Sequence, residues 1–253
     1  MDNLSHFAPR FRWGSVAPTQ LGQRVRRGPT YQFYKIVPND VMAIDAGRGL
    51  EEELEAGHLD QARTNYWDAV QQLAEEKVDV IIIGGVPVSA NFGRPEILGL
   101  IEQTKAKTGI PATSPAEAIL AGMHHLGLRS ITIGSRWGDE LNQKLVRYIT
   151  EGGIEVATIT TRAQSVAVAH GMSFEEGLET SLGVGREAAA AAPNADAILV
   201  PGGAAMSLHV IPVLEQEFGK PVITNLSAEV WQVLVHPGII PPVQGWGALL
   251  SRP

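Results

Sequence analysis

Cysteine is absent from this 253-residue chain, and its absence removes whole classes of chemistry. Without a thiol there can be no disulfide bridge, no thiolate metal site and no thiol nucleophile. Histidine, aspartate and glutamate show no spacing typical of a metal site. No phosphate-binding loop of the Gly-x-Gly-x-x-Gly or Gly-Lys-Ser/Thr type follows the glycine turns described below. We therefore expect neither a metal nor a cofactor.

Long apolar runs and basic tracts are missing as well. No run approaches the roughly twenty residues that a membrane-spanning helix needs, and residues 1–12 lack the basic-then-apolar order of a signal peptide. The net charge of −7, without a basic tract, argues against a nucleic-acid partner. The sequence predicts a cytoplasmic protein that acts on a small molecule and binds neither nucleic acid nor a membrane; a homo-oligomer is compatible with it.

The chain contains a segment that occurs twice. Residues 78–89 read Val-Asp-Val-Ile-Ile-Ile-Gly-Gly-Val-Pro-Val-Ser, and residues 195–207 read Ala-Asp-Ala-Ile-Leu-Val-Pro-Gly-Gly-Ala-Ala-Met-Ser. Each copy is typical of a buried strand that leaves through a glycine pair into a helix. The repeat predicts two similar lobes, each with a glycine turn at the carboxyl edge of its sheet.

The rest of the chain alternates between short apolar runs and amphipathic stretches. Helices are predicted over residues 59–77, over residues 115–126 after the N-cap Ser114, and from the capping-box residue Ser173 to about residue 192. Strands that alternate with helices in this way are typical of an α/β fold, with parallel sheets flanked by helices.

The boundaries between the lobes follow from the repeat. We expect a first α/β lobe over residues 1–112 with a C-terminal return of residues 226–253, and a second α/β lobe over residues 113–225. The lobes should be related by a pseudo-twofold axis with a cleft between them, where the carboxyl ends of the strands form the ligand site. Within the first lobe, residues 25–31 are predicted as a loop, and a short strand is predicted within residues 31–43.

At the two glycine turns, and in residues 127–145, 195–215 and 245–247, the sequence resembles the aspartate/glutamate racemase superfamily. The resemblance is closest to the branch that contains arylmalonate decarboxylases and maleate isomerases. It implies two lobes that face each other across the active site, with a reactive cysteine on one or both turns. At the matching positions this chain has Gly85 and Gly202.

The two glycines have a definite chemical consequence. Racemisation by opposed thiols and isomerisation through a covalent thioether are both impossible with Gly85 and Gly202. The resemblance also implies a polar pair and an aromatic hydroxyl around the substrate carboxylate, and the matching positions here are Val86, Pro87 and Trp137. The backbone amides of the two turns remain, and such amides can stabilise an enolate-type intermediate.

Proton transfer near neutral pH then requires another group. His170 precedes the capped helix and is the first candidate acid or base, because histidine titrates near neutral pH. His209 follows the second glycine turn and is a second candidate, although packing on a helix is the simpler interpretation of it. Ser89 and Ser207 are interpreted as residues of a helix start, since neither has an evident His–Asp partner.

Substrate contacts are predicted around the two turns. Arg94 is a candidate clamp for a carboxylate, and Thr19 follows a proline in a turn that borders the cleft in similar proteins. The candidate substrate-binding residues are Thr19, Gln20, Gly85, Val86, Pro87, Ser89, Asn91, Trp137, Gly202, Gly203 and Ala204, and the candidate catalytic residues are His170 and His209.

Three functions fit these features. The preferred one is a cofactor-independent, decarboxylase-like or isomerase-like enzyme that acts on a small carbonyl or carboxylate compound, aromatic compounds included, through an enolate-type intermediate. The second is a hydrolase or ring-opening enzyme, in which an activated water uses the space left by two thiols. The third is a non-catalytic protein that binds a small molecule.

Overall fold

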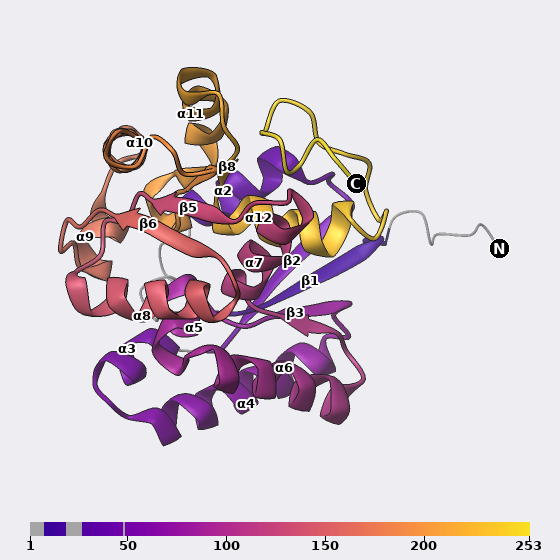
Figure 1. Cartoon of the computed structure of the whole chain (residues 1–253). Helices are drawn as coiled ribbons and strands as arrows, with labels where there is room; N and C mark the ends of the chain where they lie inside the picture. Colours follow the sequence, from indigo (N-terminus) through magenta and orange to yellow (C-terminus); the bar gives the residue numbers. More distant parts are fainter. Residues whose placement is uncertain (1–7, 19–26, 48) are drawn as a thin grey trace.

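The computed structural model describes residues 8–18, 27–47 and 49–253 and contains two four-stranded parallel sheets (Figure 1). Helices flank both sheets, so the predicted α/β fold with two similar lobes is confirmed. The apolar runs of the sequence repeat form central strands, and Ile81 and Ile198 are fully buried in them. Continuous apolar runs are expected where a parallel sheet is covered on both faces.

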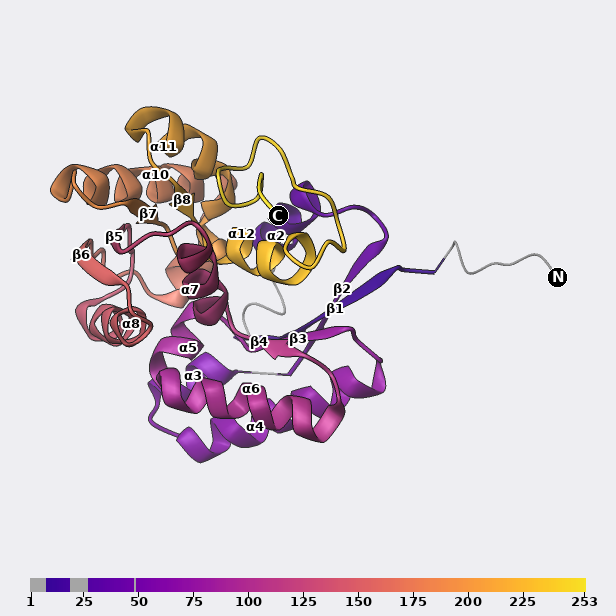
Figure 2. The same cartoon turned by 45° about the vertical axis from the view of Figure 1, so that its right-hand side comes forward.

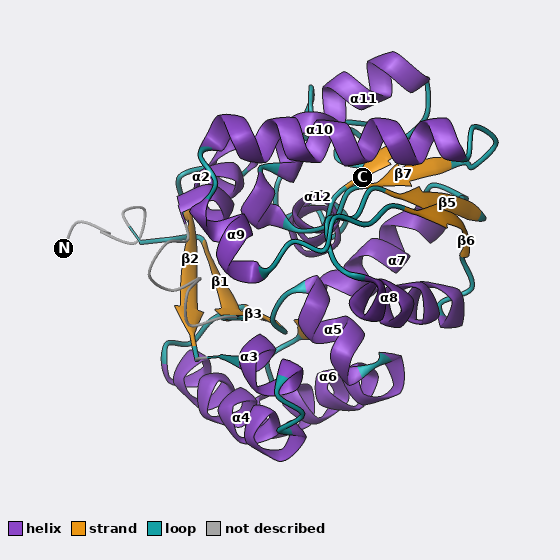
Figure 3. Ribbon diagram, turned by 90° about the vertical axis from the view of Figure 1, so that its left-hand side faces the viewer, coloured by secondary structure: helices purple, strands orange, loops and turns teal. Residues whose placement is uncertain are grey.

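The first sheet is built from the N-terminal part of the chain. Its strands are β1 (Phe11–Val16), β2 (Val41–Ala46), β3 (Val80–Ile82) and β4 (Ala112–Thr113), in the order β2-β1-β3-β4 across the sheet. Its helices are α2 (Arg27–Ile36), α3 (Leu50–Glu55), α4 (Leu59–Glu75), α5 (Val86–Phe92) and α6 (Arg94–Thr108). Helices α4 and α6 lie together on the outer side of this sheet (Figures 2 and 3).

The second sheet repeats this arrangement. Its strands are β5 (Ser130–Ile133), β6 (Glu155–Ile159), β7 (Ala197–Leu199) and β8 (Val222–Ile223), in the order β6-β5-β7-β8. Its α-helices are α7 (Pro115–His125), α8 (Asp139–Glu151), α9 (Val166–Gly171), α10 (Phe174–Ala191), α11 (Ile211–Phe218) and α12 (Asn225–Val230). Short 3₁₀ turns η2 (Gly203–Ala205) and η3 (Ser207–Val210) follow β7, and a π-helical turn η4 (Trp231–Val235) follows α12.

Each repeat begins with an aspartate at the equivalent position, and this aspartate joins two strands by hydrogen bonds. In the first lobe, Asp79 Oδ2 accepts the backbone N–H of Arg12 at 2.6 Å. In the second lobe, Asp196 Oδ2 accepts the backbone N–H groups of Arg129 and Ser130, both at 2.9 Å. Each carboxylate therefore joins its own strand to the first strand of its sheet, and the sequence repeat is also a repeat of hydrogen bonding.

Two predicted helix starts are confirmed by their caps. Ser114 Oγ accepts the backbone N–H of Glu117 at the start of α7, where Pro115 is the first helical residue. Ser173 and Glu176 form a reciprocal capping box at the start of α10. Among the helices in the described parts of the chain, none combines the length and the apolar character that crossing a bilayer requires.

The prediction for residues 27–40 was wrong; residues 25 and 26 lie outside the described part of the chain. The loop predicted for residues 25–31 and the strand predicted within residues 31–43 are replaced by α2, which begins at Arg27, and by β2, which begins only at Val41. The buried side chains of this stretch, those of Gln32, Phe33, Ile36 and Val37, follow the helical spacing of one face. The burial of this helical face therefore outweighs the local preference of aromatic and β-branched residues for a strand. The short helices α3 and α9 also have no counterpart among the predicted elements.

The segment after residue 226 contacts both lobes. Thr113 Oγ1, at the end of β4, donates to Gln232 Oε1 at 2.8 Å. Near the C-terminus, the backbone N–H of Ala248 donates to Glu215 Oε1 on α11 at 3.0 Å. In Figure 2 this yellow segment passes from α12 along the side of the second lobe. The lobe boundaries at residues 112/113 and 225/226 therefore remain a prediction.

We expect Asp196→Asn to lower the free energy of unfolding by about 1 kcal/mol at pH 7, because the charged acceptor of two backbone N–H groups becomes a neutral amide. The backbone N–H groups of Arg129 and Ser130 hold the pKa of Asp196 below its usual 3.8. A lowered pKa stabilises the fold above pH 3.8, and this contribution is lost as the pH falls further. Urea unfolding should thus show a difference at pH 7 that shrinks near pH 3. The substitution Asp68→Asn, at an exposed position, is the control. An equal change in unfolding free energy in both variants would contradict a stabilising role for the hydrogen bonds of Asp196.

Candidate functional site

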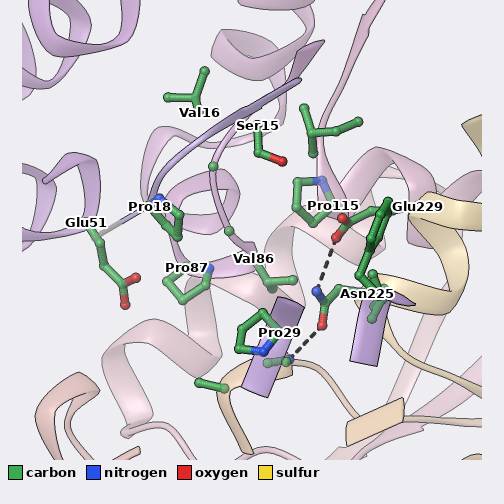
Figure 4. Close-up of a pocket in the computed structure, with 18 of the residues that line it drawn as sticks. Ser15, Val16, Pro18, Pro29, Glu51, Val86, Pro87, Pro115, Asn225 and Glu229 are labelled. Carbon is green, nitrogen blue, oxygen red and sulfur yellow. Dashed lines mark hydrogen bonds between the residues drawn. The ribbon is translucent and has the colours of Figure 1, made fainter. Parts of the chain in front are cut away.

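One cavity of about 150 Å³ lies between the lobes, at the carboxyl ends of strands from both sheets (Figure 4). A cavity of about this size accommodates benzene in other proteins, so the space suits a small ligand. Its walls combine apolar side chains with a few charged ones, as ligand sites commonly do. The lining residues used below are Trp13, Pro18, Phe33, Asp45, Glu51, Gly85, Val86, Pro87, Arg136, Trp137, Ala169, Gly202, Gly203, Ala204, Asn225 and Glu229.

Arg136 brings a positive charge into this cavity. Its side chain is only 8% exposed, and its Nε has no hydrogen-bond partner among the described residues. Burial lowers the pKa of Arg136 to about 10, and the carboxyl group of Glu51 opposes that shift, so the guanidinium stays charged at neutral pH. An incompletely paired buried cation is costly for the free protein and favours an anionic ligand.

The loop that carries Arg136 is held by a buried polar network. Gln164 N donates to the Arg136 carbonyl at 3.0 Å. Ser135 N donates to Thr160 Oγ1 at 2.9 Å, and Ser135 Oγ donates to Asn142 Oδ1 at 2.6 Å. The loop therefore presents the guanidinium from a fixed backbone, which lowers the entropy lost when a ligand binds.

Glu51 is a buried carboxyl group in the first turn of α3. It is 5% exposed, and its backbone N–H donates to Pro18 O at 2.8 Å. Burial raises the pKa of Glu51 to about 8, and the neighbouring Glu55 adds to the rise, whereas Arg136 opposes it. A carboxyl group with this pKa keeps its proton at pH 7, so it can act as a hydrogen-bond donor or as a general acid.

Asn225 links the second glycine turn to Glu229. The backbone N–H of Gly202 donates to Asn225 Oδ1 at 3.0 Å, and Asn225 Nδ2 donates to Glu229 Oε1 at 3.1 Å; both bonds are drawn in Figure 4. Gly203 O accepts from Gln32 Nε2 at 2.6 Å, so α2 of the first lobe also holds this turn. Because the amide of Gly202 is already engaged, it is not available to a substrate in this arrangement.

The two glycine turns differ in conformation. Gly202 has φ +94°, and a Cβ placed on it would lie 3.1 Å from Arg136 Nη2. Gly85 has the ordinary extended φ of −101°, and a Cβ there would lie 3.4 Å from Pro18 and from Pro87. The space next to Gly202, where the resemblance implies a thiol in related enzymes, is therefore occupied by the guanidinium, whereas Gly85 leaves room for a small side chain.

Several of the residues predicted from the sequence meet at the cavity. Whether they bind substrate remains a prediction. Those that line the cavity are Gly85, Val86, Pro87, Trp137, Gly202, Gly203 and Ala204.

Three other candidates are not among the residues that line the cavity, and substrate binding by them remains a prediction. Ser89 is fully buried within α5, where its Oγ donates to Gly85 O at 3.3 Å. Asn91 Oδ1 accepts from Lys144 Nζ at 2.9 Å. Arg94, considered as a carboxylate clamp, is already paired with both carboxylate oxygens of Glu117, at 2.9 and 3.3 Å.

The two histidine candidates differ in what the structure says of them. His209 stacks on Tyr31, with ring centroids 5.8 Å apart, and meets the edge of Trp246; it is not among the residues that line the cavity, and a catalytic role for it remains a prediction. Burial lowers the pKa of His209, and Lys35 adds to the effect. His170 falls in α9, next to the cavity-lining Ala169, but its side chain lies outside the described part. Thr19 and Gln20 also lie outside the described residues.

Sequence reasoning missed the charged residues of the cavity. Arg136 directly precedes Trp137 after a predicted strand, and the rule that ligand sites form at the carboxyl ends of strands would have found it. Asn225 follows the second strand of the second repeat in the same way. Glu51 and Glu229 carry no such signal, because their burial at the cavity depends on helix packing that involves distant parts of the chain.

Comparison with known proteins identifies the family. A sequence model described as arylmalonate decarboxylase matches residues 34–250. The chain belongs to the arylmalonate decarboxylase family. An arylmalonate decarboxylase from Bordetella bronchiseptica is 25% identical to it over 197 residues, which are 77% of this chain and 80% of that protein.

Solved structures share the fold. A crystal structure of arylmalonate decarboxylase has a TM-score of 0.75 at 20% identity, covering 96% of this chain and all of that chain. The maleate isomerase Iso from Pseudomonas putida S16 has a TM-score of 0.74 at 20% identity, covering 95% of this chain and 98% of that chain. A Nocardia farcinica maleate cis-trans isomerase variant with a covalently bound succinylcysteine intermediate has a TM-score of 0.77 at 19% identity, covering 95% of this chain and 98% of that chain.

These findings confirm the predicted relation to the arylmalonate decarboxylase and maleate isomerase branch. The family is described as arylmalonate decarboxylase, which is a lyase, so the enzyme type agrees with the lyase side of the prediction; the maleate isomerases share the fold. The succinylcysteine of the Nocardia protein has no equivalent here, because this chain contains no cysteine. The cytoplasmic location, the oligomeric state and the lack of a nucleic-acid partner remain predictions.

We expect Gly202→Ala and Gly202→Cys to destabilise the fold by about 1–3 kcal/mol, because a side chain is strained at this φ and presses on Arg136. Gly85→Ala and Gly85→Cys should cost less than about 1 kcal/mol, since φ is ordinary and the Cβ contacts are close to normal. Urea unfolding of the four variants measures the difference. A Gly202→Cys variant as stable as Gly85→Cys would show that the second turn accommodates a thiol after all.

Proposed function

We propose that the chain is a cysteine-free enzyme that binds the carboxylate of a small substrate on Arg136 and passes through an enolate-type intermediate, with Glu51 as the proton donor. The observation that carries this proposal is the buried guanidinium of Arg136, which lies over Gly202 with its Nε lacking a hydrogen-bond partner in the described structure. A substrate carboxylate supplies the missing acceptors, and arginine binds carboxylates through two parallel hydrogen bonds.

The same contact stabilises the intermediate. When a bond to the α-carbon breaks heterolytically, the electron pair that stays behind spreads onto the carboxylate as an enediolate. The second negative charge develops on the oxygens held by Arg136, in a cavity walled by Trp13, Phe33 and Trp137 that limits screening by water. The guanidinium thus takes over part of the role first assigned to the backbone amides, of which that of Gly202 is engaged by Asn225 and Pro87 has none.

Glu51 completes the step by supplying a proton. In a decarboxylation the bond to the leaving carboxyl group breaks, carbon dioxide departs, and the proton of Glu51 goes to the α-carbon. In an isomerisation the bond to the α-hydrogen breaks, a carboxylate that lines the cavity, such as Glu229, accepts that proton, and the proton of Glu51 goes to the carbon. Glu51 suits the donor role because its pKa of about 8 keeps it protonated at neutral pH.

Replacing Arg136 should separate binding from stability. For Arg136→Gln we expect aryl carboxylates such as phenylacetate to bind about 30-fold more weakly or worse, because the loss of a buried charge partner costs about 2 kcal/mol or more. Arg136→Lys should keep part of the affinity, since it retains charge but not the planar fork. The melting temperature of the free protein should not fall, because an incompletely paired buried charge is removed. Calorimetric titration and thermal unfolding test both points.

The control for Arg136 is Arg186→Gln, which removes an exposed guanidinium that pairs with Glu217 and is not among the lining residues of the cavity. Undiminished carboxylate binding by Arg136→Gln would overturn the anchor role. Turnover in water labelled with both deuterium and ¹⁸O separates the chemistries: deuterium on carbon supports carbanion chemistry, and ¹⁸O in the product would indicate the hydrolase alternative.

The pH dependence tests Glu51. With Glu51 as donor, kcat/KM should fall as the pH rises through about 8, and Glu51→Gln should lower turnover by about 100-fold and abolish that decline. The same measurement on His170→Gln tests the alternative, because His170 remains a candidate acid. A Glu51→Gln variant with wild-type turnover beside an inactive His170→Gln variant would transfer the proton donor role to His170.

Stability offers a test of Glu51 that needs no substrate. Because its pKa is raised, the stabilising contribution of its proton is fully present below the usual value of 4.5 and is lost as the pH rises through about 8. The unfolding free energy of the wild type should therefore decline relative to that of Glu51→Gln between pH 5 and pH 9. A constant difference would show that Glu51 is not a buried neutral acid.

A further inference from the structure

Helix α2 connects the first lobe to the second glycine turn. Its Gln32 side chain is fully buried, and the carboxamide forms hydrogen bonds to the backbone of two residues that follow β7. Gln32 Nε2 donates to Gly203 O at 2.6 Å, and Gln32 Oε1 accepts from the backbone N–H of Leu208 at 2.8 Å. One side chain of the first lobe therefore spans the turn of the second lobe, from η2 to η3.

These two contacts require a group that donates on one side and accepts on the other. Gly203 O can only accept and the N–H of Leu208 can only donate, so its partners determine the orientation of the carboxamide. A neutral carboxyl group has nearly the same shape and the same pair of functions, whereas a carboxylate can only accept. A glutamate placed at position 32 should therefore fit in its protonated form alone.

The residues on either side of Gln32 reinforce the docking of α2. Tyr31 stacks on His209 of η3, with ring centroids 5.8 Å apart and an angle of 3° between the ring planes. Phe33 lines the cavity. Figures 1 and 2 both show α2 beside α12, on the side of the second lobe. Three successive residues of α2 therefore contact the second turn or the cavity.

The backbone of the second turn is strained and depends on contacts from outside the turn. Met206, between η2 and η3, has a left-handed φ of +55°, which a residue with a side chain rarely adopts. Such a conformation persists only where the surrounding structure holds it. Ser181 Oγ on α10 donates to Ala205 O, and Gln32 holds the turn from the first lobe.

Resting on the proposed function, we propose that Gln32 is a positioning residue, which holds the Gly203–Ala204 peptide in the orientation that a carboxylate ligand on Arg136 requires. Both residues of this peptide line the cavity. In a trans peptide the C=O and the N–H point in opposite directions, so a bond that fixes Gly203 O also fixes the direction of the Ala204 N–H. Rotation of this peptide would change the cavity wall beside the guanidinium of Arg136.

A pH-dependent variant tests this role, by calorimetric titration of the full chain with phenylacetate. In Gln32→Glu, burial beside a carbonyl oxygen raises the pKa of the introduced carboxyl group above its usual value. At pH 5.5 the protonated group can replace the carboxamide, so the affinity should stay within about threefold of that of the wild type. At pH 8.5 the donor is lost, and the affinity relative to the wild type should fall by about tenfold or more.

Two further variants separate the hydrogen bonds from other effects. Gln32→Met keeps an unbranched side chain of similar length without donor, acceptor or charge. It should bind phenylacetate about tenfold more weakly at both pH values, which excludes repulsion by an introduced charge as the cause. Gln232→Glu is the matched control, because Gln232 accepts its hydrogen bond from Thr113 Oγ1, and a carboxylate also accepts. This control should follow the wild type at both pH values.

The backbone amide signals of Gly203 and Ala204 in ¹H–¹⁵N NMR spectra give a readout that needs no ligand. In Gln32→Glu these signals should shift as the pH rises through the pKa of the introduced carboxyl group, because the peptide loses its donor and reorients. Signals that change with pH only as they do in the wild type would overturn the positioning role.

The outcomes distinguish this inference from the proposed function. If Gln32→Glu melts at a lower temperature but binds phenylacetate as the wild type does at both pH values, Gln32 contributes to stability alone, and the inference is overturned while Arg136 can still be the anchor. If the wild type does not bind phenylacetate, the carboxylate anchor is overturned, and the NMR titration alone then supports or overturns the hold of Gln32 on this peptide. If Gln32→Met does not fold, the comparison of Gln32→Glu at the two pH values still decides the matter.

Discussion

The rest of the site depends on the burial of one guanidinium, that of Arg136, next to Gly202. A buried charge in this position is costly without an anion, and no salt bridge among the described residues includes Arg136; the loop that carries it is fixed by the hydrogen bond from Ser135 to Asn142. The glycine beneath it must lack a side chain, and the neighbouring carboxyl group of Glu51 is kept protonated by its own burial. Charge, backbone conformation and protonation are therefore linked at one point.

The duplicated scaffold and the chemistry it carries are separable. Both lobes keep the same strand order and the same aspartate clamp, with Asp79 in one and Asp196 in the other. The glycine turns that follow are not equivalent, since Gly85 is extended and Gly202 is left-handed. A symmetrical fold thus holds an asymmetrical site, in which one wall offers apolar side chains and a neutral acid and the other a cation.

Local pattern was enough to predict most of the fold, because the strands of the repeat, the capped helices and the parallel arrangement follow from short-range rules. It failed at α2, where aromatic and β-branched residues indicated a strand but Phe33 and Ile36 pack on one helical face. The sequence repeat correctly predicted that both glycine turns lie at the cavity. It did not find Glu51 or Glu229, because a carboxyl group becomes buried at the cavity through packing between separate elements of the chain, which no local pattern encodes.

The contact between Gly202 and Arg136 also constrains how this chain can change over evolutionary time. A single substitution at position 202 meets a strained backbone and an occupied space together, so thiol chemistry on that turn is not one mutational step away. Arg136 would have to move or be replaced first, and that change alone removes the anion contact proposed here. For a thiol at this position, the order of the changes therefore matters more than their number.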